Sequence, residues 1–219
     1  MNPTIMANWF DRYSRTHFHD WTVRQLNLQP YQHVLEVGCA SGQLLAIVAR
    51  TLRVGFLAGI ESSIPLYQQA YRRNKAFIHR QFSQLHLGEL HELPYPAHYF
   101  HTIYKSGIHS PGKNAVTECL RLASLLRSGG RLVWLSQTYR KEEDLRTEAA
   151  RLQAACLTAG LTDIRTEYRD FPSGPGMAVT GFKSDLYVHG LDPEPSGTIN
   201  NRLLNPKPHF ISNIARMQI

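Results

Sequence analysis

The sequence predicts an α/β protein built on a doubly wound, mostly parallel sheet of seven strands with additional N-terminal helices. Short apolar runs of strand length alternate along the chain with segments that have the apolar spacing of packed helices. Residues 33–37, "HVLEV", form a short β-branched run that leads directly into a glycine-bearing turn. Such strands pair in parallel through right-handed crossovers, and these sheets bind ligands at the carboxyl ends of their strands.

The elements follow one another in a regular cycle. Residues 8–28 carry apolar and aromatic side chains at mixed helical spacings, which predicts one or two helices before Pro30 breaks the pattern. The predicted strands cover residues 33–37, 55–60, 83–87, 101–106, 131–137, 161–171 and 177–184. The predicted helices between them cover residues 43–52, 64–77, 115–126 and 142–159, with glycines in "RSGG" and at Gly160 as stops.

Three parts are expected from this pattern. Residues 1–32 form an N-terminal helical cap, residues 33–184 form the ligand-binding domain, and residues 185–219 form an extended arm or tail. The last segment contains four prolines and two glycines and shows little periodicity, so the sequence leaves open whether it is ordered.

Composition limits the class of protein. Apolar residues make up 42% and charged residues 19%, which is a globular balance. No run is long enough to cross a bilayer and no secretory leader is evident, so we expect a cytoplasmic protein without a membrane partner. Cys39, Cys119 and Cys156 are few and far apart, and we interpret them as reduced thiols.

The formal net charge of +7 raises the question of an anionic partner. No basic stripe is interleaved with aromatic residues, so a solvated basic face is favoured and a nucleic-acid partner is not expected.

The turn in "HVLEVGCASGQLL" indicates which kind of ligand is bound. A dinucleotide fingerprint requires a small residue where this chain has Gln43, so the match to a nicotinamide or flavin site is poor. A pattern with an acidic residue aligns instead, through Glu36, Gly38, Ala40 and Gly42. A carboxylate at this place suits a cationic ligand rather than a pyrophosphate.

The segment "VLEVGCASG" resembles the nucleotide-binding signature of the class I S-adenosylmethionine-dependent methyltransferases, of the small-molecule type. Two further segments of that family have counterparts in the right order, in "GELHELPYPAHYFHTIY" from Gly88 and "RLASLLRSGGRLVWL" from Arg121. The resemblance covers residues 33–137 and implies the Rossmann-like methyltransferase fold. It also implies S-adenosylmethionine as cofactor and S-adenosylhomocysteine as product.

The resemblance implies a role for each matching residue. Glu36 accepts from the methionyl ammonium, while Gly38 and Gly42 allow close backbone approach. Glu61 takes the ribose hydroxyls, and Glu89 with the Leu90 backbone faces the adenine. The complete implied cofactor-binding set is Glu36, Gly38, Cys39, Ala40, Gly42, Glu61, Ser62, Glu89, Leu90 and Ser106.

Three positions depart from the family pattern. Ala40 replaces the usual second glycine, which the turn tolerates if the backbone angle there is ordinary. His101 stands where aspartate usually follows phenylalanine, and Glu89 stands where aspartate is commoner. None of the three removes a required cofactor contact.

Methyl transfer needs alignment and a dehydrated pocket rather than one universal catalytic residue. His109 in "KSGIHSP" is the candidate general base, with a packing or capping histidine as the alternative. Tyr13, His17, His19 and Trp21 are secondary candidates that are otherwise core residues. The histidine-containing segments form no convincing metal site.

The segment after the fourth predicted strand lacks the Asn/Asp-Pro-Pro-aromatic turn of base and glutamine N-methyltransferases. The leading hypothesis is therefore a methyltransferase acting on a small-molecule acceptor. The alternatives are a catalytically inactive binding or assembly protein with this fold, an RNA methyltransferase, and, last, a nicotinamide-dependent oxidoreductase. The acceptor and the oligomeric state are left open.

Overall fold

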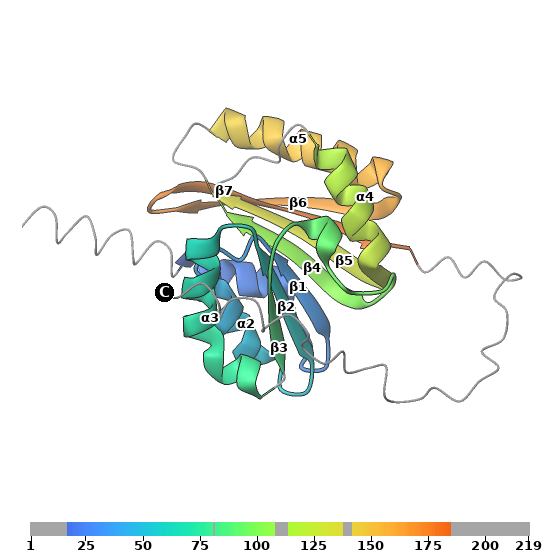
Figure 1. Cartoon of the computed structure of the whole chain (residues 1–219). Helices are drawn as coiled ribbons and strands as arrows, with labels where there is room; N and C mark the ends of the chain where they lie inside the picture. Colours follow the sequence, from blue (N-terminus) through green and yellow to red (C-terminus); the bar gives the residue numbers. More distant parts are fainter. Residues whose placement is uncertain (1–16, 81, 108–113, 138–141, 185–219) are drawn as a thin grey trace, which may run out of the picture. The chain divides into compact units, whose positions relative to one another are not determined.

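The structure is a computed structural model that describes residues 17–184, apart from residues 81, 108–113 and 138–141. In this part of the chain, seven strands form one sheet in the order β3-β2-β1-β4-β5-β7-β6 (Figure 1). The strands are β1 (His33–Val37), β2 (Phe56–Glu61), β3 (Ser83–Leu87), β4 (Phe100–Gly107), β5 (Leu126–Gln137), β6 (Leu161–Phe171) and β7 (Gly174–Lys183). The predicted α/β fold with a mostly parallel sheet is confirmed, and β7 is antiparallel to both of its neighbours.

Helices cover both faces of the sheet. Helices α4 (Ala115–Leu125) and α5 (Glu142–Thr158) lie on one face, and α2 (Gln43–Thr51) and α3 (Ile64–His79) lie on the other (Figure 1). Successive side chains of a strand point to opposite faces. Leu35 and Val37 of β1 accordingly pack in the core under α4 and α5, while Val34 packs in the core under α2.

The predicted N-terminal helix is present in the described residues from position 17 to position 26. Phe18 and Trp21 are buried and contact the ring of Phe171 at centroid distances of 5.6 and 5.5 Å. Trp21 also donates a hydrogen bond from Nε1 to Glu167 Oε1. Trp21 is therefore a core residue, and the start of this helix lies where β6 ends.

One boundary differs from the sequence prediction. The "RSGG" segment, expected to end a helix, lies inside β5, which begins directly after α4 at Leu126. The pairing of β4 with β5 shifts register between Phe100 and Thr102, and Gly129 there has a φ of 68°. A β-bulge of this kind lets the strand absorb glycines that local sequence rules assign to a helix stop.

Two predicted parts lie outside the described residues, namely residues 1–16 of the cap and the arm from residue 185 onward. Cys39, Cys119 and Cys156 are free and buried. Within the described ranges, no helix has the length and apolar character needed to cross a membrane.

Candidate cofactor-binding site

The strand order places a topological switch point next to β1. The chain runs outward through β2 and β3 on one side of β1, and then returns to β4 on the other side. Ligands of doubly wound sheets bind at the carboxyl ends of the strands beside such a reversal. The loops after β1 and β2, together with the described end of β4, therefore form the candidate site.

The turn after β1 is held against β2 by its backbone. The amides of Gly38 and Cys39 both donate to the Ile60 carbonyl, at 2.9 and 3.1 Å, and Gly42 N donates to Cys39 O at 2.8 Å. Gly38 and Gly42 have φ values of 68° and 69°, in the left-handed region that glycine adopts most easily.

Ala40 corrects an expectation about this turn. Its φ is 48°, so its backbone angle is left-handed rather than ordinary. Such an angle costs an L-residue about 1 kcal/mol relative to glycine. The alanine is held there because its amide donates to Glu61 Oε2 at 2.8 Å.

The two glycines serve different purposes. A Cβ placed on Gly42 would lie 2.5 Å from Asn74 Nδ2 and 2.9 Å from the Ala70 backbone, so this glycine allows α3 to pack against the turn. A Cβ placed on Gly38 would have nothing within 4 Å. The space above Gly38 is therefore open to a ligand that approaches the backbone closely.

Glu61 joins the two loops at the switch point. Its side chain is only 7% exposed. Oε2 accepts from Ala40 N at 2.8 Å, and Oε1 accepts from Ser63 N at 2.9 Å. Each carboxylate oxygen has two lone pairs, so each retains one acceptor position after these bonds. Ser62, the neighbouring candidate, is exposed.

Glu36 is more deeply buried, at 2% exposure. Its Oε2 accepts a hydrogen bond of 2.9 Å from the hydroxyl of Tyr104, the residue directly opposite on β4. The pKa of Glu36 is raised to about 8, mainly by burial; the bond from Tyr104 opposes the shift, and the nearby charge of Glu61 adds to it. Glu36 is therefore largely protonated near neutrality in the ligand-free protein.

Cys39 is also protonated because of its surroundings. Burial, together with the charges of Glu36 and Glu61, raises the pKa of its thiol. A protonated, buried thiol is a small apolar side chain rather than a nucleophile. Cys39 is thus a packing residue of the turn.

The remaining candidates lie at the expected strand ends. Ser106 is half-buried next to the last residue of β4, and Glu89 is exposed just after β3. Glu89 N donates to Glu92 Oε2 at 2.6 Å, and Glu89 O accepts from Glu92 N at 2.9 Å. These bonds shape the short 3-10 helix η1 (Leu90–Glu92), which fixes Leu90 at the same edge.

Two residues of this region were missed by the sequence analysis. Asn74 is 1% exposed, and its Nδ2 donates to Gly42 O at 3.0 Å and to Ala70 O at 2.9 Å. Arg73 also donates from Nη1 to the Ser41 carbonyl. A signal was present for Asn74, because Ala70 and Asn74 are four residues apart and form the buried face of α3.

Other predicted residues lie elsewhere. His109 and Tyr13 fall outside the described residues, so their roles stay predictions. His101, which replaces the family aspartate, lies near the start of β4 and therefore at the opposite edge of the sheet from the loops described above.

The comparisons with known proteins agree with this geometry. The family model described as Protein-L-isoaspartate(D-aspartate) O-methyltransferase (PCMT) matches residues 4–93. Among curated proteins, none matches the chain.

Solved structures share the fold at low sequence identity. An S-adenosylmethionine-dependent methyltransferase from Aquifex aeolicus is 14% identical, with a TM-score of 0.63 over 83% of this chain and 98% of that one. A putative sarcosine dimethylglycine methyltransferase from Galdieria sulphuraria is 13% identical, with a TM-score of 0.63 over 80% and 88%. The [4+2]-cyclase SpnF is 17% identical, with a TM-score of 0.63 over 77% and 81%.

The family match over residues 4–93, the strand order and the loop geometry after β1 and β2 point in the same direction. The chain has the fold of the S-adenosylmethionine-dependent methyltransferases that it is similar to, in agreement with the resemblance seen in its sequence.

Proposed function

We propose that this protein transfers the methyl group of S-adenosylmethionine to a small-molecule acceptor. One observation carries the cofactor part of the proposal. Two buried carboxyl groups, Glu36 and Glu61, lie at the carboxyl ends of neighbouring strands at the switch point, beside the open space above Gly38. The residues at this edge suit a ligand with a cationic amino acid at one end and a ribose at the other.

Glu61 fits the ribose because its two oxygens are fixed by backbone donors and each keeps a free lone pair. Two hydroxyls can therefore donate to it without displacing either loop. Gly38 fits the methionyl part because the missing side chain leaves room at the backbone. Glu89 and Leu90 at η1 are proposed to border the adenine.

Glu36 fits the methionyl ammonium through its raised pKa. A cation nearby favours the carboxylate over the carboxylic acid, so binding lowers this pKa and expels the proton. Tyr104 keeps its bond to Oε2 and orients the group. Cofactor affinity is therefore expected to rise with pH up to about 8 and to level off above it.

Bound S-adenosylmethionine supplies an electrophilic methyl group on a sulfonium, and the protein contributes alignment and exclusion of water. His109 is proposed as the base where the acceptor must lose a proton. Residues 1–32 are proposed as a cap, since Phe18 and Trp21 pack against Phe171 at the carboxyl edge of the sheet.

Three observations bear on the acceptor class. The family match ends at residue 93, before β4 begins at Phe100, so it concerns the cofactor half of the domain. The sequence after β4 lacks the turn expected for methylation of nucleic-acid bases. The neighbour from Galdieria sulphuraria is described as a putative sarcosine dimethylglycine methyltransferase. These points together favour a small molecule.

Calorimetry tests the cofactor proposal. S-adenosylmethionine and S-adenosylhomocysteine are expected to bind, and NAD is not. Gly38→Ala fills the open space and is expected to weaken both sulfur nucleotides at least tenfold. Gly160→Ala is the matched control, because Gly160 has a φ of 78° and equally open surroundings at the end of α5.

Three outcomes distinguish the alternatives. Binding of NAD without the sulfur nucleotides overturns the proposal. Tight binding with no turnover on any acceptor indicates the catalytically inactive binding protein. Methylation of RNA, with binding that weakens steeply as salt increases, indicates the RNA methyltransferase.

A further inference from the structure

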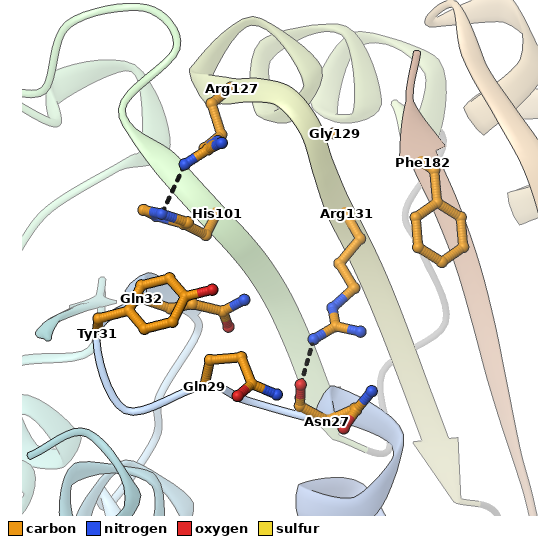
Figure 2. Close-up of a pocket in the computed structure, with 9 residues that line it drawn as sticks. All are labelled: Asn27, Gln29, Tyr31, Gln32, His101, Arg127, Gly129, Arg131 and Phe182. Carbon is orange, nitrogen blue, oxygen red and sulfur yellow. Dashed lines mark hydrogen bonds between the residues drawn. The ribbon is translucent and has the colours of Figure 1, made fainter. Parts of the chain in front are cut away.

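A pocket of about 340 Å³ lies at the amino edge of the sheet, opposite the candidate cofactor site (Figure 2). The segment from Asn27 to Gln32, which enters β1, forms one side of it. His101 near the start of β4, and Arg127 and Arg131 of β5, form the other side. The amide side chains of Gln29 and Gln32 lie between these two sides in Figure 2.

The pocket is cationic and contains no acidic side chain among its lining residues. Arg131 is half-buried, and it donates from Nη2 to Asn27 O at 2.7 Å and from Nε to Thr102 Oγ1 at 3.3 Å. Arg127 is exposed and donates from Nε to Ser128 O at 3.2 Å. Neither guanidinium forms an ion pair with a carboxylate of the described residues, so their charges are not neutralised within this part of the chain.

His101 adds a further hydrogen-bond donor to the pocket. Burial, together with the charges of Arg127 and His33, lowers the pKa of His101 to about 4, so its ring is neutral near pH 7. The backbone amide of His33 donates to His101 Nδ1 at 3.1 Å, which means that Nδ1 carries no proton. A neutral imidazole has one N–H, which must then be on Nε2.

Arg127 Nη1 lies 2.8 Å from that same Nε2 (Figure 2). A guanidinium can only donate, and the Nε2–H can only donate as well. Two donors therefore face each other at hydrogen-bond distance, and among the described residues Arg127 has only the Ser128 carbonyl as a further acceptor, through Nε. An oxyanion placed next to both would accept from each, and it would also neutralise the charge of Arg127.

We propose that this pocket binds the phosphate group of a small phosphorylated molecule. A phosphate offers three terminal oxygens and a carboxylate two, so a phosphate can accept from His101 and Arg127 together and still present an oxygen toward Arg131, which lines the same pocket. The pocket volume and the amides of Gln29 and Gln32 leave room and hydrogen-bonding groups for the rest of the molecule. This site is independent of methyl transfer, because it lies at the other end of the strands.

Titration of the full-length protein with inorganic phosphate, at constant ionic strength, tests the proposal by calorimetry and by nitrogen-15 NMR of the histidine rings. Arg127→Gln is expected to weaken phosphate at least tenfold. Arg72→Gln removes the same charge from an exposed position on α3 and is expected to change the affinity less than twofold. Equal weakening by both variants would mean unspecific charge attraction and would overturn the proposal.

The His101→Asp variant provides a second readout that does not depend on Arg127. Aspartate can accept from the His33 amide and pair with Arg127, so the fold is expected to be retained while phosphate binding is lost. In the wild type, phosphate is expected to shift the His101 Nε2 resonance with little effect on the other described histidines. Unchanged phosphate affinity in His101→Asp, or no shift at His101, would contradict the proposal.

The source of the phosphate is decided by competition. Ribose 5-phosphate is expected to bind at least as tightly as inorganic phosphate, with ribose and acetate much weaker. Tight binding of a single-stranded RNA oligomer, with no binding of ribose 5-phosphate, would overturn the assignment to a small molecule. Binding of S-adenosylmethionine by His101→Asp is expected to be unchanged, so failure here is distinguishable from failure of the methyltransferase proposal.

Discussion

The two edges of the sheet differ in the ionisable side chains that they present, which are acidic at the carboxyl edge and basic at the amino edge. At the carboxyl edge, Glu36 and Glu61 are buried carboxylates, and the donors around them are backbone amides and the Tyr104 hydroxyl. At the amino edge, the pocket is lined by the hydrogen-bond donors His101, Arg127 and Arg131. Among the residues that the structure describes, no carboxylate forms an ion pair with either arginine. Each edge therefore lacks the partner that a ligand of the opposite charge would bring.

If both proposals hold, the difference means that one fold binds two kinds of ligand at separate edges. A parallel sheet separates the loops that follow its strands from the loops that precede them. A cation at one edge and an anion at the other are then independent, provided that the β1 and β4 strands between them stay rigid. Variants at one edge should leave binding at the other unchanged, and this expectation can be tested.

The largest effect is expected for Gly42→Ala at the carboxyl edge. The new Cβ meets Asn74 and the Ala70 backbone and is also held at a left-handed φ, so the free energy of unfolding should fall by about 4 kcal/mol. Denaturant unfolding measures the loss, with Gly160→Ala as the control for the backbone angle alone. A loss no larger than that of Gly160→Ala would show that α3 does not press on the turn.

The next effect is the pH-dependent stabilisation by Glu36→Gln. The folded-state pKa of Glu36 is raised to about 8, so ionising this group costs stability as the pH rises from about 4.5 to about 8. Glutamine has no such ionisation. Its free energy of unfolding, relative to wild type, should therefore be higher at pH 8.5 than at pH 5 by about 3 kcal/mol.

Unfolding at the two pH values measures this difference, and Glu143→Gln at an exposed position of α5 is the control. A Glu36→Gln curve parallel to the wild-type curve would mean that Glu36 is already ionised in the free protein. The same variant is expected to weaken S-adenosylmethionine while leaving phosphate affinity at the amino edge intact.

The smallest effect is expected for Ala40→Gly. Glycine removes the cost of the left-handed angle, so stability should rise by about 1 kcal/mol. Ala49→Gly makes the same change inside α2 and should lower stability by about 1 kcal/mol. Thermal unfolding compares the two, and a decrease in both would indicate that Ala40 contributes packing that outweighs its strain.

Much of the fold could be predicted because its elements have local signals. The alternation of apolar runs and helical spacings located β1 and β6 at their observed bounds, and α5 ends within a residue of the prediction. The start of β5 could not be predicted, since its glycines carry a local stop signal that pairing with β4 overrides.

The chain alone indicated the class of site through its resemblance to a family, because Glu36, Gly38, Gly42 and Glu61 match that family's motif within short segments. Only the tertiary structure decided the angle at Ala40, the burial of Asn74 and the protonation of Glu36. It also decided that His101 faces Arg127 rather than the cofactor edge. These properties arise from neighbours that are distant in sequence, and a charge or an angle is set by what surrounds it in space.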